Sequence, residues 1–181
     1  MNIIQVGNTE VILQNYELGQ GKIIVSDLDK GSWSYYWGSM GGKTIEEFLK
    51  STNADYFAGK LCNKKSQFSA KNTVKNIRQY VRKGMNYDLP WYKFPSGQKE
   101  LREKICDIER YAFTEYEALA MIESLHSSLW CLDLNYEDEK EFLAIIESHF
   151  TQEPWYFLGE EPSQEYLFLK KLHKKLIKKL K

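Results

Sequence analysis

The spacing of the apolar residues changes once along this chain, near residue 43, and that change decides the class of fold. Before it, short apolar runs at residues 3–6 and 23–25 are separated by glycine turns, which is typical of strands. After it, apolar residues recur at intervals of three and four, which is typical of amphipathic helices. The sequence therefore predicts an α+β fold, in which a small N-terminal antiparallel sheet of three or four strands packs with about six helices.

The length of 181 residues is that of one ordinary domain. No internal repeat and no linker between independent cores is visible. We therefore expect a single domain over residues 1–181, with residues 1–43 mainly β and residues 44–181 mainly α. A hydrophobic fraction of 43% with 14% aromatic residues excludes disordered, collagen-like and coiled-coil classes.

The sequence carries no secretory signal pattern and no apolar run of about 18 residues that would span a bilayer. Its three cysteines are an odd number at wide spacing, which is typical of reduced thiols in the cytosol. No CxxC pair or histidine cluster predicts a zinc site, so we expect neither a metal nor a cofactor.

The formal net charge of zero arises by cancellation between blocks of opposite sign. Residues 1–59 carry −3, residues 60–104 carry +9, residues 105–169 carry −13 and residues 170–181 carry +7. Neutrality therefore excludes no class of charged partner. The blocks predict either pairing between basic and acidic helices of the same molecule or two distinct interaction surfaces.

A basic stripe is expected on the helix predicted from residue 69 to residue 83. Its members are spaced four, three and four apart, on the side opposite the apolar residues: Lys71, Lys75, Arg78 and Arg82. Such a stripe can follow nucleic-acid phosphates, and three nearby aromatic residues could stack on bases: Trp91, Tyr92 and Phe94. The alternative is an ordinary solvated face that meets the acidic block of the same molecule.

The lysine-rich tail places four leucines on one helical face: Leu169, Leu172, Leu176 and Leu180. These leucines either dock on the core or leave the helix to bind a membrane or a partner. The acidic residues between 137 and 147 are open to three interpretations, namely solubility, a surface for a basic protein, or imitation of nucleic-acid charge.

Trp33, Tyr35 and Trp37 share one face of the last predicted strand, because side chains alternate along a strand. If exposed, this aromatic face would be a docking surface. The alternative is that it lies in the core, since helices must cover one side of the sheet.

The glycine-rich segment of residues 38–44 follows a strand and precedes a helix, which is the setting of a phosphate-binding loop. Its candidate ligands are Gly41, Gly42, Lys43 and Thr44. The spacing is one residue shorter than the motif requires, and the alternative is a plain glycine turn. A nucleotide- or phosphate-binding enzyme is the alternative function that rests on this loop, since no other catalytic constellation is found.

The string Trp37-Gly38-Ser39-Met40-Gly41, with the aromatic strand before it and the Phe48-Leu49 pair after it, resembles a group of small phage and prophage proteins. The resemblance covers about residues 20–62. It implies a phage-derived accessory protein in the cytoplasm of a bacterial host, and it implies no defined chemistry or catalytic residue.

Together these observations favour a phage-type accessory protein, more readily a binding protein than an enzyme, whose partner is a host protein or nucleic acid. The open edge of a small sheet also offers a route to a homodimer.

Overall fold

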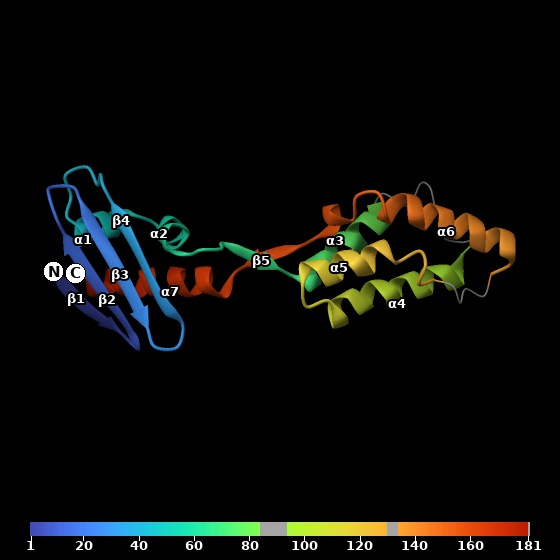
Figure 1. The fold of residues 1–181 in the computed structure, drawn as a ribbon, viewed down its shortest axis with the longest axis horizontal. Helices are drawn as coiled ribbons and strands as arrows, with labels where there is room; N and C mark the ends of the chain where they lie inside the picture. Colours follow the sequence, from blue (N-terminus) through green and yellow to red (C-terminus); the bar gives the residue numbers. More distant parts are fainter. Residues whose placement is uncertain (84–93, 130–133, 181) are drawn as a thin grey trace. The chain divides into compact units, whose positions relative to one another are not determined.

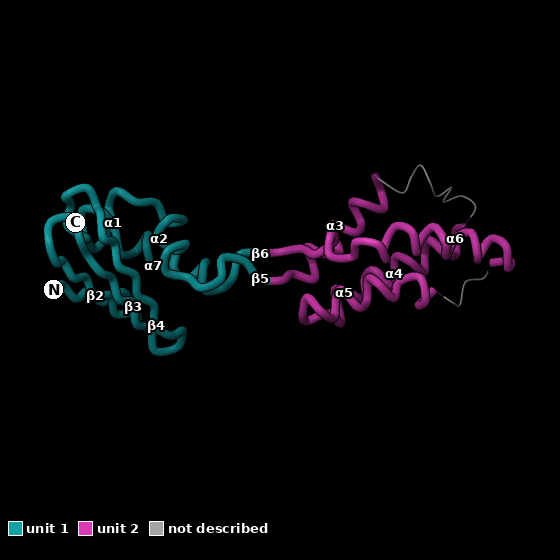
Figure 2. Tube along the Cα trace, turned by 45° about the horizontal axis from the view of Figure 1, so that its top comes forward, with its two compact units in different colours: residues 1–67, 162–181 teal, residues 68–161 magenta. Residues whose placement is uncertain are grey.

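The computed structural model describes residues 1–83, 94–129 and 134–180, and these divide into two compact units. Unit 1 contains residues 1–67 and 162–181, and unit 2 contains residues 68–161 (Figure 2). Each unit has its own cluster of buried apolar side chains, where the sequence led us to expect one core. The assignment of the whole chain to a single domain stays a prediction.

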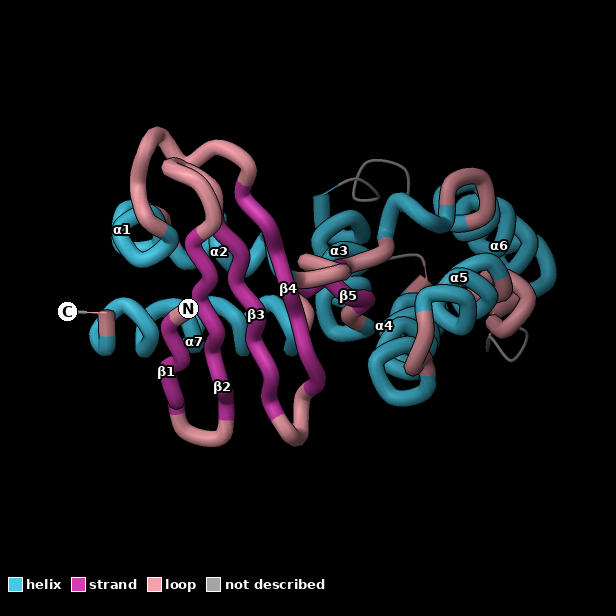
Figure 3. The backbone as a smooth tube through the Cα atoms, turned by 60° about the vertical axis from the view of Figure 1, so that its left-hand side comes forward, coloured by secondary structure: helices cyan, strands magenta, loops and turns pink. Residues whose placement is uncertain are grey.

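Unit 1 is built on a four-stranded antiparallel sheet in which sequential strands are neighbours (Figure 3). Its strands are β1 (Asn2–Val6), β2 (Thr9–Asn15), β3 (Gly21–Asp27) and β4 (Gly31–Trp37). The β1–β2 turn contains Gly7 at φ +65°, a backbone conformation that favours glycine. Alternate residues of the sheet, such as Val11, Ile23 and Val25, are fully buried on one face.

Three helices cover that buried face and complete the core of unit 1 (Figure 1). They are α1 (Ile45–Ser51), α2 (Ala54–Leu61) and α7 (Gln164–Lys179). Each begins where a side chain caps the first turn, and the capping residues are Thr44, Asn53 and Ser163. The last helix of the chain thus contributes to the same core as the N-terminal strands.

Unit 2 is helical and lies in the sequence between α2 and α7. The short strands β5 (Ser66–Phe68) and β6 (Glu160–Pro162) pair where the chain enters and leaves it. Its elements are α3 (Ala70–Lys83), α4 (Pro95–Tyr111), α5 (Glu115–Glu123), α6 (Tyr136–Phe150) and the 3₁₀ turn η1 (Pro154–Phe157). Their buried residues form one cluster that includes Ile77, Ile105 and Phe142.

The α+β class is confirmed, with four strands in the main sheet and seven α-helices among the described residues. Helix α5 ends at Glu123, although apolar residues continue at helical spacing through Leu125 and Leu129. Ser124, Ser127 and Ser128 follow it, and their hydroxyl groups donate to backbone carbonyls three residues earlier. Such local hydrogen bonds compete with the helical pattern and favour a series of turns.

Gly159 joins the start of α3 to the segment that follows η1. Its N–H donates to the hydroxyl of the buried Thr73 at 2.8 Å, and its carbonyl accepts from Ser69 N–H at 2.8 Å. A Cβ at this position would lie 2.4 Å from backbone atoms of Asn72 and Thr73, far inside contact distance. Only glycine allows the two segments to approach this closely.

We expect Gly159→Ala to lower the free energy of unfolding by about 1–3 kcal/mol, because backbone atoms must move to admit the methyl group. Chemical denaturation followed by circular dichroism measures the change. Gly38→Ala is the matched control, since its Cβ would meet only a tyrosine ring atom at an ordinary 3.5 Å. Equal stability of the two variants would contradict this account.

His173 is the buried ionisable residue of α7. Its Nε2 lies 3.3 Å from the carbonyl oxygen of Leu49, and its ring packs on Phe57 at a centroid distance of 4.8 Å. Burial lowers the pKa of His173 below its usual value of 6.5, and the contact with Leu49 only partly offsets this effect. The folded protein therefore binds a proton on this residue less readily than the unfolded chain does.

We therefore expect unit 1 to keep the full contribution of His173 above about pH 6.5 and to lose stability as the pH falls below that value. The slope for one such group is at most about 1.4 kcal/mol per pH unit. Thermal unfolding of the wild type and of His173→Gln between pH 7.5 and about pH 5 tests this. The variant should show a flatter pH dependence than the wild type, and an unchanged slope would contradict this account.

Candidate nucleic-acid interface

Helix α3 carries five cations and no acidic residue along its 14 residues. Its apolar residues Val74 and Ile77 are buried in the core of unit 2, and this turns the opposite face outward. All members of the predicted stripe are exposed on that outer face: Lys71, Lys75, Arg78 and Arg82. The arrangement follows from the helical repeat, which brings residues three and four apart onto one side.

Helix α4 forms the second wall of a hollow beside the upper part of this stripe. The hollow has a volume of about 510 Å³, with Arg78 and Arg82 on one side and Arg102 on the other. Leu101 and Ile105 add apolar surface to its lining. Three guanidinium groups therefore line one concavity, and no carboxylate lies among its described lining residues.

A hydrogen bond holds one of these guanidinium groups across the two helices. Arg78 Nη2 donates to the Sγ of Cys106 on α4 at 3.0 Å. A thiol is a weak acceptor and carries no formal charge, so Arg78 is positioned without being neutralised. Among the described residues no carboxylate pairs with Arg78, which lines the hollow with its charge intact.

A second hollow of about 720 Å³ continues along α3 and shares Arg78 and Arg82 with the first. Its other cations are Lys71, Lys75 and Lys83, and Glu109 is the carboxylate among its described lining residues. The two hollows are neighbours that share Arg78 and Arg82, and together we call them the basic groove. It is lined by six cations: Lys71, Lys75, Arg78, Arg82, Lys83 and Arg102.

No ion pair joins any cation of the basic groove to an acid within the described residues. The ion pairs recorded there lie elsewhere, between Arg110 and Asp107 at 3.5 Å and between Lys170 and Asp55 at 2.7 Å. The acidic helix α6 instead contributes Phe142, Ile146 and Phe150 to the core of unit 2. Of the two readings of the charge blocks, the structure favours separate basic and acidic surfaces.

The aromatic residues expected to stack on bases do not form part of this surface. Trp91 and Tyr92 fall outside the described residues. Phe94 is fully buried and packs on Phe142 with ring centroids 5.4 Å apart, so it is a core residue. That expectation is corrected for Phe94, and the described groove offers contacts to phosphates instead of aromatic stacking.

The aromatic face of β4 lies in the core of unit 1, which is the alternative raised from the sequence. Trp33 and Trp37 are 9% and 5% exposed, and Tyr35 is half-buried against the same core. The Trp33 indole N–H donates to Glu165 of α7, and that of Trp37 donates to the Tyr56 hydroxyl at 3.1 Å. Both tryptophans are buried beneath the helices, and both indole N–H groups have acceptors. The described face is therefore part of the core and not an exposed docking surface.

The glycine-rich loop is a turn held by the chain itself. Gly41 and Gly42 have φ values of +64° and +74°, which explains the pair of glycines. Thr44 caps α1, its own N–H donates to the carboxylate of Glu47, and Asn15 accepts the N–H of Ile45.

These contacts weigh against phosphate binding at Gly41, Gly42, Lys43 and Thr44. The amides of Thr44 and Ile45 are occupied, and Glu46 and Glu47 place negative charge in the first turn. Lys43 Nζ contacts the hydroxyl of Ser51 at 3.3 Å. Hydrogen bonding to Thr44 lowers the pKa of Glu47, which keeps that carboxylate ionised. A phosphate would meet repulsion there, in contrast to the basic groove.

The leucines of the C-terminal helix dock on the core of unit 1, which was the first of the two alternatives for this tail. Leu169, Leu172, Leu176 and Leu180 are all buried there. The outward face of α7 is a second row of exposed lysines: Lys171, Lys174, Lys175 and Lys178. Because its apolar face is occupied, α7 has no free apolar face to insert into a bilayer. Within the described part of the chain, no helix is both long and apolar enough to cross a membrane.

Residues of α4 are the part of the groove that the sequence analysis missed. Gln98, Arg102 and Cys106 are spaced four apart, so one face of α4 presents them together. That spacing is visible in the sequence, but α4 contains both acidic and basic residues and so shows no stripe of one charge. Only the packing of α4 beside α3 shows that Arg102 adds to the cluster.

No group of three or more His, Cys, Asp or Glu side chains is placed to hold a metal ion among the described residues. The fold and the groove together define an α+β protein with a helical insertion that carries a concave cationic surface. The chain belongs to the phage family Phage_phiTE_072, whose family model matches residues 2–181. Comparison with curated proteins and with solved structures gives no match.

Proposed function

We propose that this phage protein binds nucleic acid through the phosphate backbone, using the basic groove of unit 2, in the cytoplasm of the bacterial host. The observation that carries the proposal is the set of six cations on α3 and α4 that line the two neighbouring hollows without an ion-pair partner among the described residues. Concentrated positive charge of this kind is what recognises a polyanion.

The length of the stripe suits a segment of nucleic acid. Lys71 and Arg82 are eleven residues apart on a helix, or roughly 16 Å at 1.5 Å per residue. That distance corresponds to about five phosphates along one strand of a duplex. The four cations of the stripe therefore span a run of successive phosphates, and Arg102 widens the contact from α4.

The polar groups in the groove favour positioning over sequence reading. Lysine and arginine contacts to phosphates fix the orientation of a nucleic acid but carry no sequence information. Uncharged donors such as Asn72, Gln79 and Gln98 line the same hollows and can add hydrogen bonds to the backbone. We therefore propose binding with weak sequence preference and strong dependence on salt.

The test is a quadruple variant that replaces Lys71, Lys75, Arg78 and Arg82 by alanine. Fluorescence anisotropy with a labelled 20-base-pair duplex, measured at several salt concentrations, gives the affinity and its salt slope. If each of the four cations neutralises one phosphate, the slope of log affinity against log salt becomes shallower by about 3.6. We expect the affinity at low salt to fall more than about tenfold.

The matched control replaces Lys171, Lys174, Lys175 and Lys178 on α7, which changes the net charge by the same amount. It should retain most of the affinity, and thermal unfolding should show that both variants are folded. An equal loss in the two variants would indicate general charge attraction and contradict a site in the groove. Failure of the wild type to bind duplex or single strands at low salt would end the proposal.

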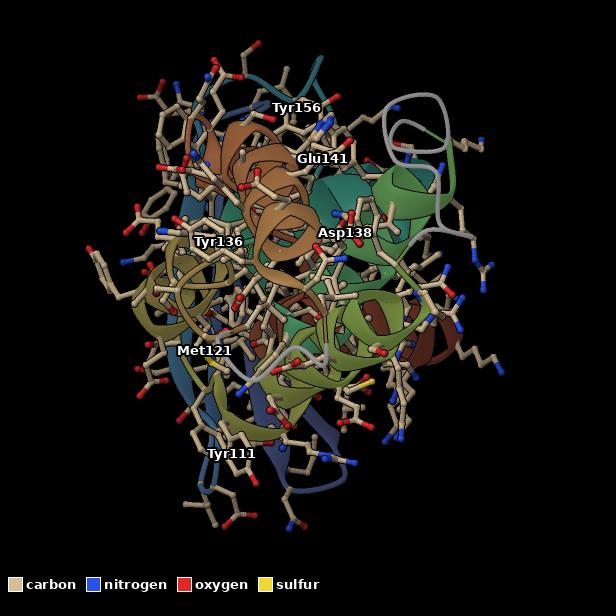
Figure 4. All side chains as sticks on the ribbon, turned by 90° about the vertical axis from the view of Figure 1, so that its right-hand side faces the viewer. Tyr111, Met121, Tyr136, Asp138, Glu141 and Tyr156 are labelled. Atoms are coloured by element: carbon tan, nitrogen blue, oxygen red, sulfur yellow. The ribbon has the colours of Figure 1, made fainter. Side chains whose placement is uncertain are left out.

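A host protein partner is the second candidate, and a separate observation favours it. At the junction of α4 and α5, Phe113 and Tyr116 are 82% and 84% exposed, and Tyr111 beside them is also exposed. Figure 4 shows Tyr111, together with Tyr136 and Tyr156, projecting from the surface of unit 2. Exposed aromatic side chains are typical of surfaces that bind proteins, where charged groups such as Glu115 lie at the polar rim.

A pull-down from nuclease-treated host lysate separates this candidate from nucleic acid. A protein retained by the wild type and by the groove variant, but lost with Phe113→Ser and Tyr116→Ser together, would support the aromatic junction as its binding surface. These substitutions remove exposed apolar area and should leave the stability within about 0.5 kcal/mol. A partner that is lost on nuclease treatment would count against this second candidate.

A further inference from the structure

The main sheet of unit 1 has an open face with a row of isoleucines across it. In the strand register Ile3 lies opposite Ile12, Ile12 opposite Ile24, and Ile24 opposite Ser34. Side chains alternate along each strand, so this row points away from α1, α2 and α7, which cover the other face. Ile3 is 54% exposed, and Ile12 and Ile24 are half-buried.

Two charged residues flank the isoleucine row on opposite sides. Glu10 lies on β2 on one side of the row, paired with Ser26 of β3. Lys22 lies on β3 on the other side, between Gln14 and Tyr36. Four residues of strand separate the two charges, or about 13 Å at 3.3 Å per residue. Among the described residues neither one forms an ion pair.

We propose that this open face binds the same face of a second copy of the chain, with the two-fold axis parallel to the isoleucine row. A rotation about that line brings the row of one copy onto the row of the other. It also exchanges the two flanks, so that Glu10 of each copy comes next to Lys22 of the second copy. Two ion pairs then enclose one apolar stripe.

The charges select this orientation over its alternative. A two-fold axis along the strands would keep each flank opposite itself and bring Glu10 towards Glu10 of the second copy. Like charges held this close destabilise an interface. The remaining neighbours in the proposed arrangement are polar, since Ser26 and Ser32 on one flank meet Lys22 and Tyr36 on the other. Two sheets packed face to face in this way keep their strands within about 30°.

The area available predicts a weak dimer. Four strands spaced about 4.8 Å apart and up to seven residues long present a small face, below the standard size of a stable interface. We therefore expect association in the micromolar range. The proposal does not depend on the proposed binding of nucleic acid, which uses unit 2.

The experiment is sedimentation equilibrium of the full chain from about 5 to 500 μM, a range chosen for a weak interface. We expect a monomer–dimer equilibrium that Ile12→Thr weakens. Glu10→Lys and Lys22→Glu should each weaken it by about tenfold, because symmetry repeats every pair twice. The double variant Glu10→Lys with Lys22→Glu restores opposite charges between copies and should return towards the wild-type constant.

Lys178→Glu on the exposed face of α7 is the matched control and should dimerise like the wild type. So should the quadruple groove variant, which separates this result from binding by unit 2. A wild type that stays monomeric over the whole range would overturn the proposal. A double variant no better than the single ones, or a dimer unaffected by every substitution in the open face, would do the same.

Discussion

The contact between α7 and the sheet is the interaction on which the rest of the structure depends. Leu169, Leu172 and Leu176 come more than 130 residues after β4, yet they are buried in the same core as β2 and β3. Full burial of one such side chain contributes about 1.5–3 kcal/mol, so the row as a whole is a large part of the stability of a small unit. Without α7, the four strands, α1 and α2 would leave exposed to water the part of the sheet that these leucines cover. Closing unit 1 therefore requires the chain to return to its start.

That requirement explains why unit 2 exists as an insertion. The chain leaves unit 1 after α2 and returns to it for α7. Residues 68–161 between these helices form an insertion with a separate hydrophobic core. The ends of this insertion are held together by the β5–β6 pair and by the close approach of Gly159 to the start of α3. The first turn of α3 is thereby fixed through Ser69 and Thr73, and the direction of its cations follows.

Local patterns predicted the fold class and the N-terminal sheet, and long-range packing decided which faces of the elements are buried. The caps at Asn53, Thr114, Asn135 and Ser163 are short-range hydrogen bonds, and the sequence marks each helix start. The burial of Trp33 and Trp37 depends on which face the distant α7 covers, and strand alternation cannot decide that. The two clusters of buried side chains likewise depend on long-range packing, since a return of the chain leaves no linker composition. In the groove, the helical spacing of the cations predicted the stripe on α3. The sequence did not predict that Arg102 of α4 lines the same hollow.

The concentrated charge of the basic groove has an energetic cost for helix α3. Lys71 and Lys75, and likewise Arg78 and Arg82, are like charges at i and i+4, and each such pair destabilises a helix by about 0.2–0.5 kcal/mol. No acid on α3 offsets these pairs, so the helix depends on the burial of Val74 and Ile77 and on its fixed first turn. A bound polyanion would remove the repulsion while leaving those contacts intact. If the groove binds nucleic acid as proposed, binding would therefore stabilise unit 2.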